Sequence, residues 1–94
     1  MNNRMKTVFS ALAENEAFAR SAAAAFVMPL DPTVEELTEI KTAVSEAVSN
    51  SVIHGYSGWE DRSQAMVELE CEINGNGRVT IIVSDHGRGI ANVE

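Results

Sequence analysis

A strict alternation of apolar and acidic residues runs from position 67 to position 73, and it constrains the fold more than any other feature of the chain. Successive side chains of a β-strand point to opposite faces, so the pattern predicts a strand with one face in a core and a charged edge in water. Its apolar positions are Val67, Leu69, Cys71 and Ile73, and its acidic positions are Glu68, Glu70 and Glu72. Residues 74–77 (NGNG) then predict a hairpin turn, and residues 79–83 (VTIIV) a second strand covered on both faces.

Upstream of this hairpin, residues 5–10 predict a short strand and residues 15–28 predict a helix. The helix ends before Pro29, because proline cannot continue the hydrogen-bonding pattern. Its buried face is expected to consist of four apolar residues at helical spacing, namely Phe18, Ala22, Ala25 and Phe26. Glu16 and Arg20 lie four residues apart and are expected to form an ion pair on this helix.

A second helix is expected from about Thr33 to about His54. Thr33 and Glu36 have the spacing of a capping box, in which each side chain covers a free backbone amide of the other residue. Asp31 before Pro32 is a competing cap. Gly55 is expected to end the helix in the left-handed conformation.

The predicted order is strand, helix, helix, strand, strand, with polar loops over residues 56–64 and 84–94. This order predicts an α+β fold, a two-layer α/β sandwich with helices on one face of a mixed, largely antiparallel sheet. A length of 94 residues and an apolar share of 45% fit one folded domain, residues 1–94.

The net charge of −7 argues against nucleic acid as a partner, because no basic patch offsets it. A single cysteine excludes an internal disulfide framework and agrees with a reducing compartment. No signal peptide or membrane span is visible, so a cytoplasmic protein without a membrane role is expected.

Two features point to chemistry. On the second helix, Glu46, Asn50 and His54 are spaced by four and form a polar stripe that is expected to border the buried face. For Glu46 alone, a solvated helix edge is the simpler explanation. Directly after the last predicted strand comes D-x-G-x-G, with Asp85, Gly87 and Gly89; it places a carboxylate at a strand end beside backbone that a planar ligand can approach closely.

Neither feature is specific alone, and a tight turn would explain the second one. The chain contains neither a P-loop motif nor a dinucleotide-binding fingerprint. A metal site built from His54, Cys71 and His86 is disfavoured, because these residues lack the paired spacing of metal ligands.

Together, E-x-x-x-N on a helix and D-x-G-x-G after a hairpin resemble the GHKL ATPases, the superfamily with the Bergerat fold. The segments FSALAENEAFAR (residues 9–20) and LDPTVEELTEIKTAVSEAVSNSVIHGY (residues 30–56) narrow the resemblance to sporulation anti-sigma factors of the anti-sigma F type, which are also serine-protein kinases. In that family the helix glutamate is the general base, here Glu46, and the asparagine binds Mg²⁺, here Asn50. The aspartate, here Asp85, receives the adenine amino group of ATP, with Gly87 and Gly89 beside the base.

The resemblance also implies partners. The family phosphorylates a serine of an anti-anti-sigma protein and, as a homodimer, holds a sporulation sigma factor. Glu16 and Arg20 fall in the region that contacts partner proteins. The family continues beyond residue 94 with an ATP lid, a second glycine-rich segment and a closing helix and strand, so the chain as given is expected to be partial or inactive. Two other interpretations stay open: a non-catalytic dimerisation and sigma-binding module, and the ATPase domain of a histidine kinase.

Overall fold

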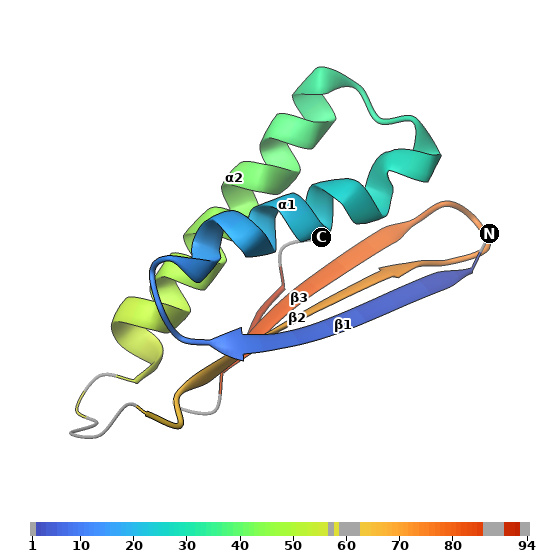
Figure 1. Cartoon of the computed structure of the whole chain (residues 1–94). Helices are drawn as coiled ribbons and strands as arrows, with labels where there is room; N and C mark the ends of the chain where they lie inside the picture. The colour runs from blue at the N-terminus through green and yellow to red at the C-terminus, as the bar shows by residue number, and fades with distance from the viewer. Residues whose placement is uncertain (1, 57, 59–62, 86–89, 93–94) are drawn as a thin grey trace.

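The computed structural model describes residues 2–56, 58, 63–85 and 90–92, the last three for their backbone alone. Two helices lie side by side on one face of a twisted sheet (Figure 1). The elements in chain order are β1 (Asn3–Ser10), α1 (Asn15–Val27), the short 3-10 helix η1 (Met28–Leu30), α2 (Val34–Asn50), the single π-helical turn η2 (Ser51–Gly55), β2 (Met66–Ile73), β3 (Val79–Asp85) and β4 (Ile90–Asn92).

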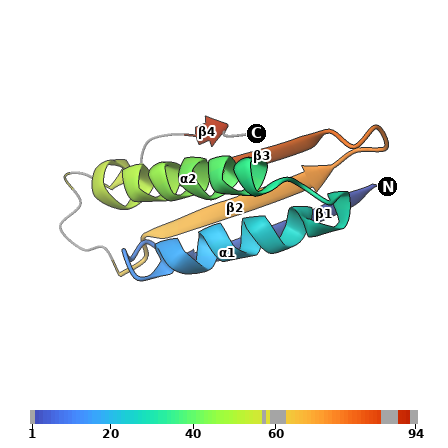
Figure 2. The same ribbon diagram turned by 90° about the horizontal axis from the view of Figure 1, so that it is seen from above.

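The strands follow the order β1-β2-β3-β4, and each described pairing is antiparallel. Seen from above, α1 lies toward the β1 side of the sheet and α2 toward the β3 side (Figure 2). This arrangement confirms the predicted α+β class with helices on one face. The short strand β4 lies within residues 84–94, which the sequence had predicted as a loop, so that prediction was wrong for residues 90–92.

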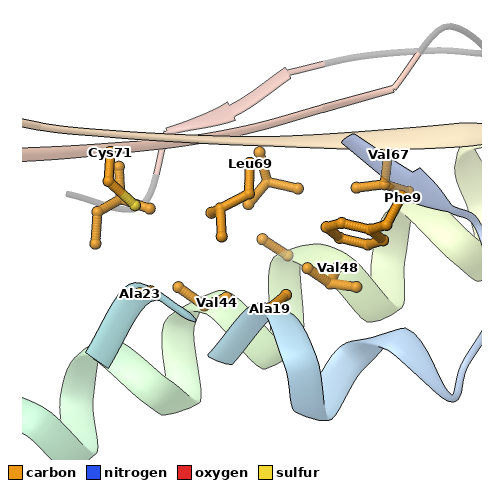
Figure 3. Close-up of a cluster of buried hydrophobic side chains, with 11 residues drawn as sticks. Phe9, Ala19, Ala23, Val44, Val48, Val67, Leu69 and Cys71 are labelled. Carbon is orange, nitrogen blue, oxygen red and sulfur yellow. The ribbon is translucent and has the colours of Figure 1, made fainter. Parts of the chain in front are cut away.

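The core forms where β2 meets both helices (Figure 3). The alternation of residues 67–73 is confirmed, since each of its apolar side chains is buried and each glutamate is half-buried. The core cluster comprises Phe9, Ala19, Ala23, Val44, Ala47, Val48, Val67, Leu69, Cys71, Ile81 and Val83. The burial of these apolar side chains is the main source of folding free energy.

The glutamates of β2 do not form an edge, because β2 is an inner strand. They lie on the sheet face opposite the helices, where two of them pair with cations of β1. Glu72 lies 2.9 Å from Arg4, and Glu68 lies 3.1 Å from Lys6. On β3 the helices cover only the face that carries Ile81 and Val83, whereas Ile82 is half-buried, so the prediction of cover on both faces was wrong.

The predicted buried face of α1 was right for Ala22 and Phe26, which are half-buried against the core, and wrong for Phe18 and Ala25. Phe18 keeps 50% of its surface exposed and Ala25 is exposed, while the buried residues are Ala19, Ala23, Ala24 and Val27. Small alanine side chains allow α1 to approach α2 and the sheet closely, and a larger ring at position 19 would hold the layers apart. The Phe18 ring instead contacts Phe9 edge-on at the rim of the core, with ring centroids 5.9 Å apart.

The start of α2 follows the predicted capping box. The Thr33 hydroxyl accepts from the Glu36 amide at 3.1 Å, and the Glu36 carboxylate accepts from the Thr33 amide at 2.8 Å. The competing cap is not used, because Asp31 adopts a left-handed conformation (φ 54°) that ends η1. No described helix combines the length and the apolar character that crossing a bilayer requires.

Cys71 provides a test of this core. Burial, reinforced by the Glu70 carboxylate, raises the pKa of the Cys71 thiol from its ordinary value of 9.0 to about 11. Between those pH values the unfolded chain loses this proton while the folded chain keeps it, so stability should fall as the pH rises from 9 to 11. Urea unfolding of the wild type and of Cys71→Ala at pH 7, 9 and 11 should show a smaller fall in the variant. Parallel losses in the two proteins would contradict the burial of this thiol.

Candidate functional site

The polar stripe of α2 faces solvent. Glu46, Asn50 and His54 are all exposed, and the expectation that the stripe borders the buried face was wrong for Glu46. The buried side of α2 is centred on Val44 and Val48. At about 100° per residue, Glu46 lies about 200° around the helix from Val44, which is nearly opposite the core. The carboxylate of Glu46 therefore stays available to a ligand or a protein partner.

Glu46 lines a shallow, open hollow of about 380 Å³ between the two helices. Helix α1 contributes Arg20 to this hollow, and α2 contributes Thr38, Lys41, Thr42, Ser45 and Glu46. The Arg20 guanidinium lies 3.8 Å from the Glu16 carboxylate, which confirms the predicted ion pair, and 3.5 Å from the Ser45 hydroxyl. An exposed ion pair of this kind contributes only a few tenths of a kcal/mol. The interactions thus orient Arg20 without removing it from solvent.

Asp85 is the last residue of β3, and its carboxylate lies against the end of the helical segment that carries Glu46 and Asn50. The contact is at Gly55, which is buried. A Cβ atom built on Gly55 would lie only 2.6 Å from Oδ2 of Asp85 and 2.7 Å from its Cγ. No real side chain tolerates such a distance without displacing one of the two groups. A glycine is therefore needed at position 55 for the carboxylate to occupy this place.

This contact corrects the prediction for Gly55. The residue is part of the π-helical turn η2 and does not adopt the left-handed conformation of a helix-ending glycine. The missing side chain of Gly55 leaves space for Asp85 of β3 and is not needed for a left-handed turn at the helix terminus. The sequence signal was present, because a glycine follows the polar stripe, but a helix-ending glycine was an equally good explanation.

Tyr56 is a second residue that sequence reasoning missed, since it was assigned to a polar surface loop. Only 1% of its surface is exposed. Its hydroxyl donates to the carbonyl oxygen of Met66 and accepts from the Met66 amide at 3.1 Å. Met66 begins β2, and the next residue, Val67, lies opposite Asp85 in the sheet. Tyr56 therefore fixes the chain just after Gly55 to the sheet beside Asp85.

The structure thus brings the end of β3 to the end of the α2–η2 segment. Glu46 lies nine residues before Gly55, roughly 13 Å along a helix axis, and Asn50 lies between them on the exposed side. The remaining predicted residues of this site, Gly87 and Gly89, fall outside the described part of the chain, as does His86 of the disfavoured metal site. Within that part, no group of three or more histidine, cysteine, aspartate or glutamate side chains could hold a metal ion by itself.

The residues fit an adenine nucleotide at one observed point. The Asp85 carboxylate lies against Gly55, in space that a Cβ atom at position 55 would fill. A carboxylate can accept a hydrogen bond from the amino group of adenine. Asn50 offers one neutral oxygen, which suits a cation held mainly by phosphates and water and not by a protein cage.

Comparison with known proteins identifies the class. The sequence model of the histidine kinase-like ATPase domain family matches residues 9–94, so the chain belongs to this family. It is 54% identical over 93 residues to the anti-sigma F factor of Clostridium beijerinckii and 53% identical over 94 residues to that of Anoxybacillus flavithermus. These alignments include 99% and 100% of this chain, and the chain spans 62% of the length of each relative. The resemblance predicted from residues 9–20 and 30–56 is confirmed.

Proposed function

We propose that this chain is the larger part of an anti-sigma factor that also acts as an ATP-dependent serine-protein kinase in the cytoplasm. Its proposed partners are a sporulation sigma factor, which it holds, and an anti-anti-sigma protein, which it phosphorylates on serine. The observation that carries the proposal is the seating of the Asp85 carboxylate against Gly55 at the end of the segment with Glu46 and Asn50. The likeness to anti-sigma F factors at about half identity supports it.

In this proposal each residue has a separate task. Asp85 accepts a hydrogen bond from the adenine amino group, Gly87 and Gly89 leave room beside the base, and Asn50 gives an oxygen to Mg²⁺. ATP would supply the phosphoryl group, and the Mg²⁺ bound with it would neutralise the charge that develops on that group. Glu46 accepts the proton of the attacking serine hydroxyl, a role for which its exposure on α2 leaves it accessible.

The contact with protein partners is proposed at Arg20 and Glu16. Arg20 shares one hollow with Glu46, so a partner that contacts Arg20 comes next to the proposed base. Arginine binds carboxylates with two parallel hydrogen bonds and is frequent at the energetic centres of interfaces.

A homodimer is proposed on different grounds. Strand β1 is an end strand in the order of the described sheet, and edge strands are prone to pair with other chains. Three large apolar side chains near it are about half exposed, namely Val8, Leu12 and Phe18. The Phe18 ring packs against Phe9 on the helix side of β1, and Val8, the neighbour of Phe9, points to the opposite face, so apolar surface is exposed on both sides of this end strand, as is typical of a protein interface.

The adenine contact is tested with Asp85→Asn. Loss of the carboxylate should weaken Mg·ATP binding about tenfold to a hundredfold, the equivalent of about 1–3 kcal/mol for a buried polar group left without its partner. Isothermal titration calorimetry with Mg·ATP and Mg·GTP measures the affinity and the selectivity. Asp31→Asn, at an exposed turn, is the matched control. Unchanged ATP affinity in Asp85→Asn would remove the adenine contact, and no binding in the wild type would favour a sigma-binding module without catalysis.

The base role is tested with Glu46→Gln. This variant should bind Mg·ATP as the wild type does, because the substituted group is exposed and lies nine residues before Gly55, where Asp85 makes its contact. Its transfer of ³²P from ATP to the serine of the anti-anti-sigma protein should fall by about 10²- to 10⁴-fold, the usual contribution of a general base. Glu39→Gln, an exposed glutamate on the same helix, should transfer phosphate normally. Normal transfer by Glu46→Gln would exclude this residue as the base.

The partner surface is tested with Arg20→Ala. The variant should lose about tenfold or more in affinity for the sigma factor or the anti-anti-sigma protein, the cost of removing an arginine at an interface centre. Its Mg·ATP affinity should not change. Surface plasmon resonance measures partner binding, and Arg78→Ala, in the exposed hairpin turn, serves as the control. Wild-type binding of both partners by Arg20→Ala would place the interface elsewhere.

A further inference from the structure

We infer that Gly55 is a positioning residue for Asp85 and thereby determines how strongly the site prefers adenine over guanine. The inference rests on the proposed function, because it gives Asp85 the adenine contact. It assigns to Gly55, with Tyr56 as its anchor, a task in nucleotide selection beyond ending a helix.

The distances make position 55 sensitive to a single methyl group. The missing Cβ would approach Oδ2, Cγ and Oδ1 of Asp85 at 2.6, 2.7 and 3.1 Å. All three are atoms of one short side chain, which can turn about its own bonds more easily than the sheet or helix backbone can move. An alanine at position 55 should therefore leave the fold intact and rotate the Asp85 carboxylate away from its place.

The backbone on both sides of the contact is held in place. Tyr56 follows Gly55 directly, and its buried hydroxyl has hydrogen bonds to both backbone polar groups of Met66. Asp85 in turn pairs with Val67, the residue after Met66. Gly55, through its neighbour Tyr56, and Asp85 are thus held by two consecutive residues of β2. Neither backbone segment can therefore move away to relieve a clash between them.

The consequence for recognition follows from hydrogen-bond direction. A carboxylate accepts and cannot donate, so it favours the amino group of adenine and opposes the carbonyl oxygen of guanine. Moving the carboxylate removes the favourable contact with one base and the repulsion against the other. A displaced Asp85 carboxylate should therefore lower both the affinity for ATP and the preference for ATP over GTP. A general loss of stability would instead lower the affinities for ATP and GTP equally.

The experiment is Gly55→Ala, alone and combined with Asp85→Asn, in the intact protein that carries this chain. Calorimetry with Mg·ATP and Mg·GTP should show ATP affinity reduced about tenfold or more in Gly55→Ala and the ATP-to-GTP ratio reduced with it. The double variant should bind ATP as weakly as Asp85→Asn alone, since both changes remove the same contact. Gly75→Ala is the matched control, because a Cβ there would have only Asn2 nearby, at 3.6 Å.

Thermal unfolding keeps the test decisive if Gly55→Ala folds poorly. In that case Asp85→Ala should restore folding to the Gly55→Ala variant, because it removes the atoms that the new methyl group meets. Failure of that rescue would overturn the inference, as would wild-type ATP affinity in Gly55→Ala or fully additive losses in the double variant. If Asp85→Asn itself leaves ATP affinity unchanged, the proposed function fails and the inference fails with it. If Asp85→Asn weakens ATP and Gly55→Ala does not, the inference alone fails.

Discussion

The apolar side chains that β2 turns toward the helices determine where every other described element lies. Val67, Leu69 and Cys71 are fully buried, and they meet helix residues that are mostly alanine and valine. Because these helix side chains are short, α1 and α2 can both lie close to one strand, one on each side of it. The result is a small core in which β2 is the shared surface, so a change in its register would turn glutamates into the core.

The same strand carries the geometry of the site. Phe9 and Asp85 lie on either side of Val67 in the sheet, and the preceding residue, Met66, binds the Tyr56 hydroxyl. One end of β2 therefore gathers the end of β3 and the end of the α2–η2 segment. A carboxylate at the tip of a strand would ordinarily sample several orientations. Here the buried Gly55 gives it a defined neighbour, and the sheet and the tyrosine hold that neighbour in place.

Sequence reasoning succeeded where the physical cause is local and failed where it is tertiary. The alternation of residues 67–73 and the Thr33–Glu36 capping box each depend on neighbours within a few residues, and both were predicted. The buried face of α1 was predicted only in part, because a run of alanines fits any side of a helix and the two phenylalanines dominated the pattern. Gly55 and Tyr56 were missed for a different reason, since each acts on a residue ten or more positions away. The family of the chain was predictable because two motifs on separate elements had to occur together.

The spacing along α2 connects the two halves of the proposed reaction. Asp85 meets Gly55 at one end of the segment, and Glu46, roughly 13 Å earlier on the axis, shares a hollow with Arg20 of α1. A nucleoside triphosphate is an extended ligand, so its base and its terminal phosphate must be recognised at separate points. A helix whose exposed side runs from the proposed base contact at Asp85 toward Arg20 can contact both the base and the terminal phosphate of such a ligand. In the proposed reaction, a protein that docks on Arg20 would bring its serine to the phosphate end of the site, where Glu46 would accept the proton of the serine hydroxyl.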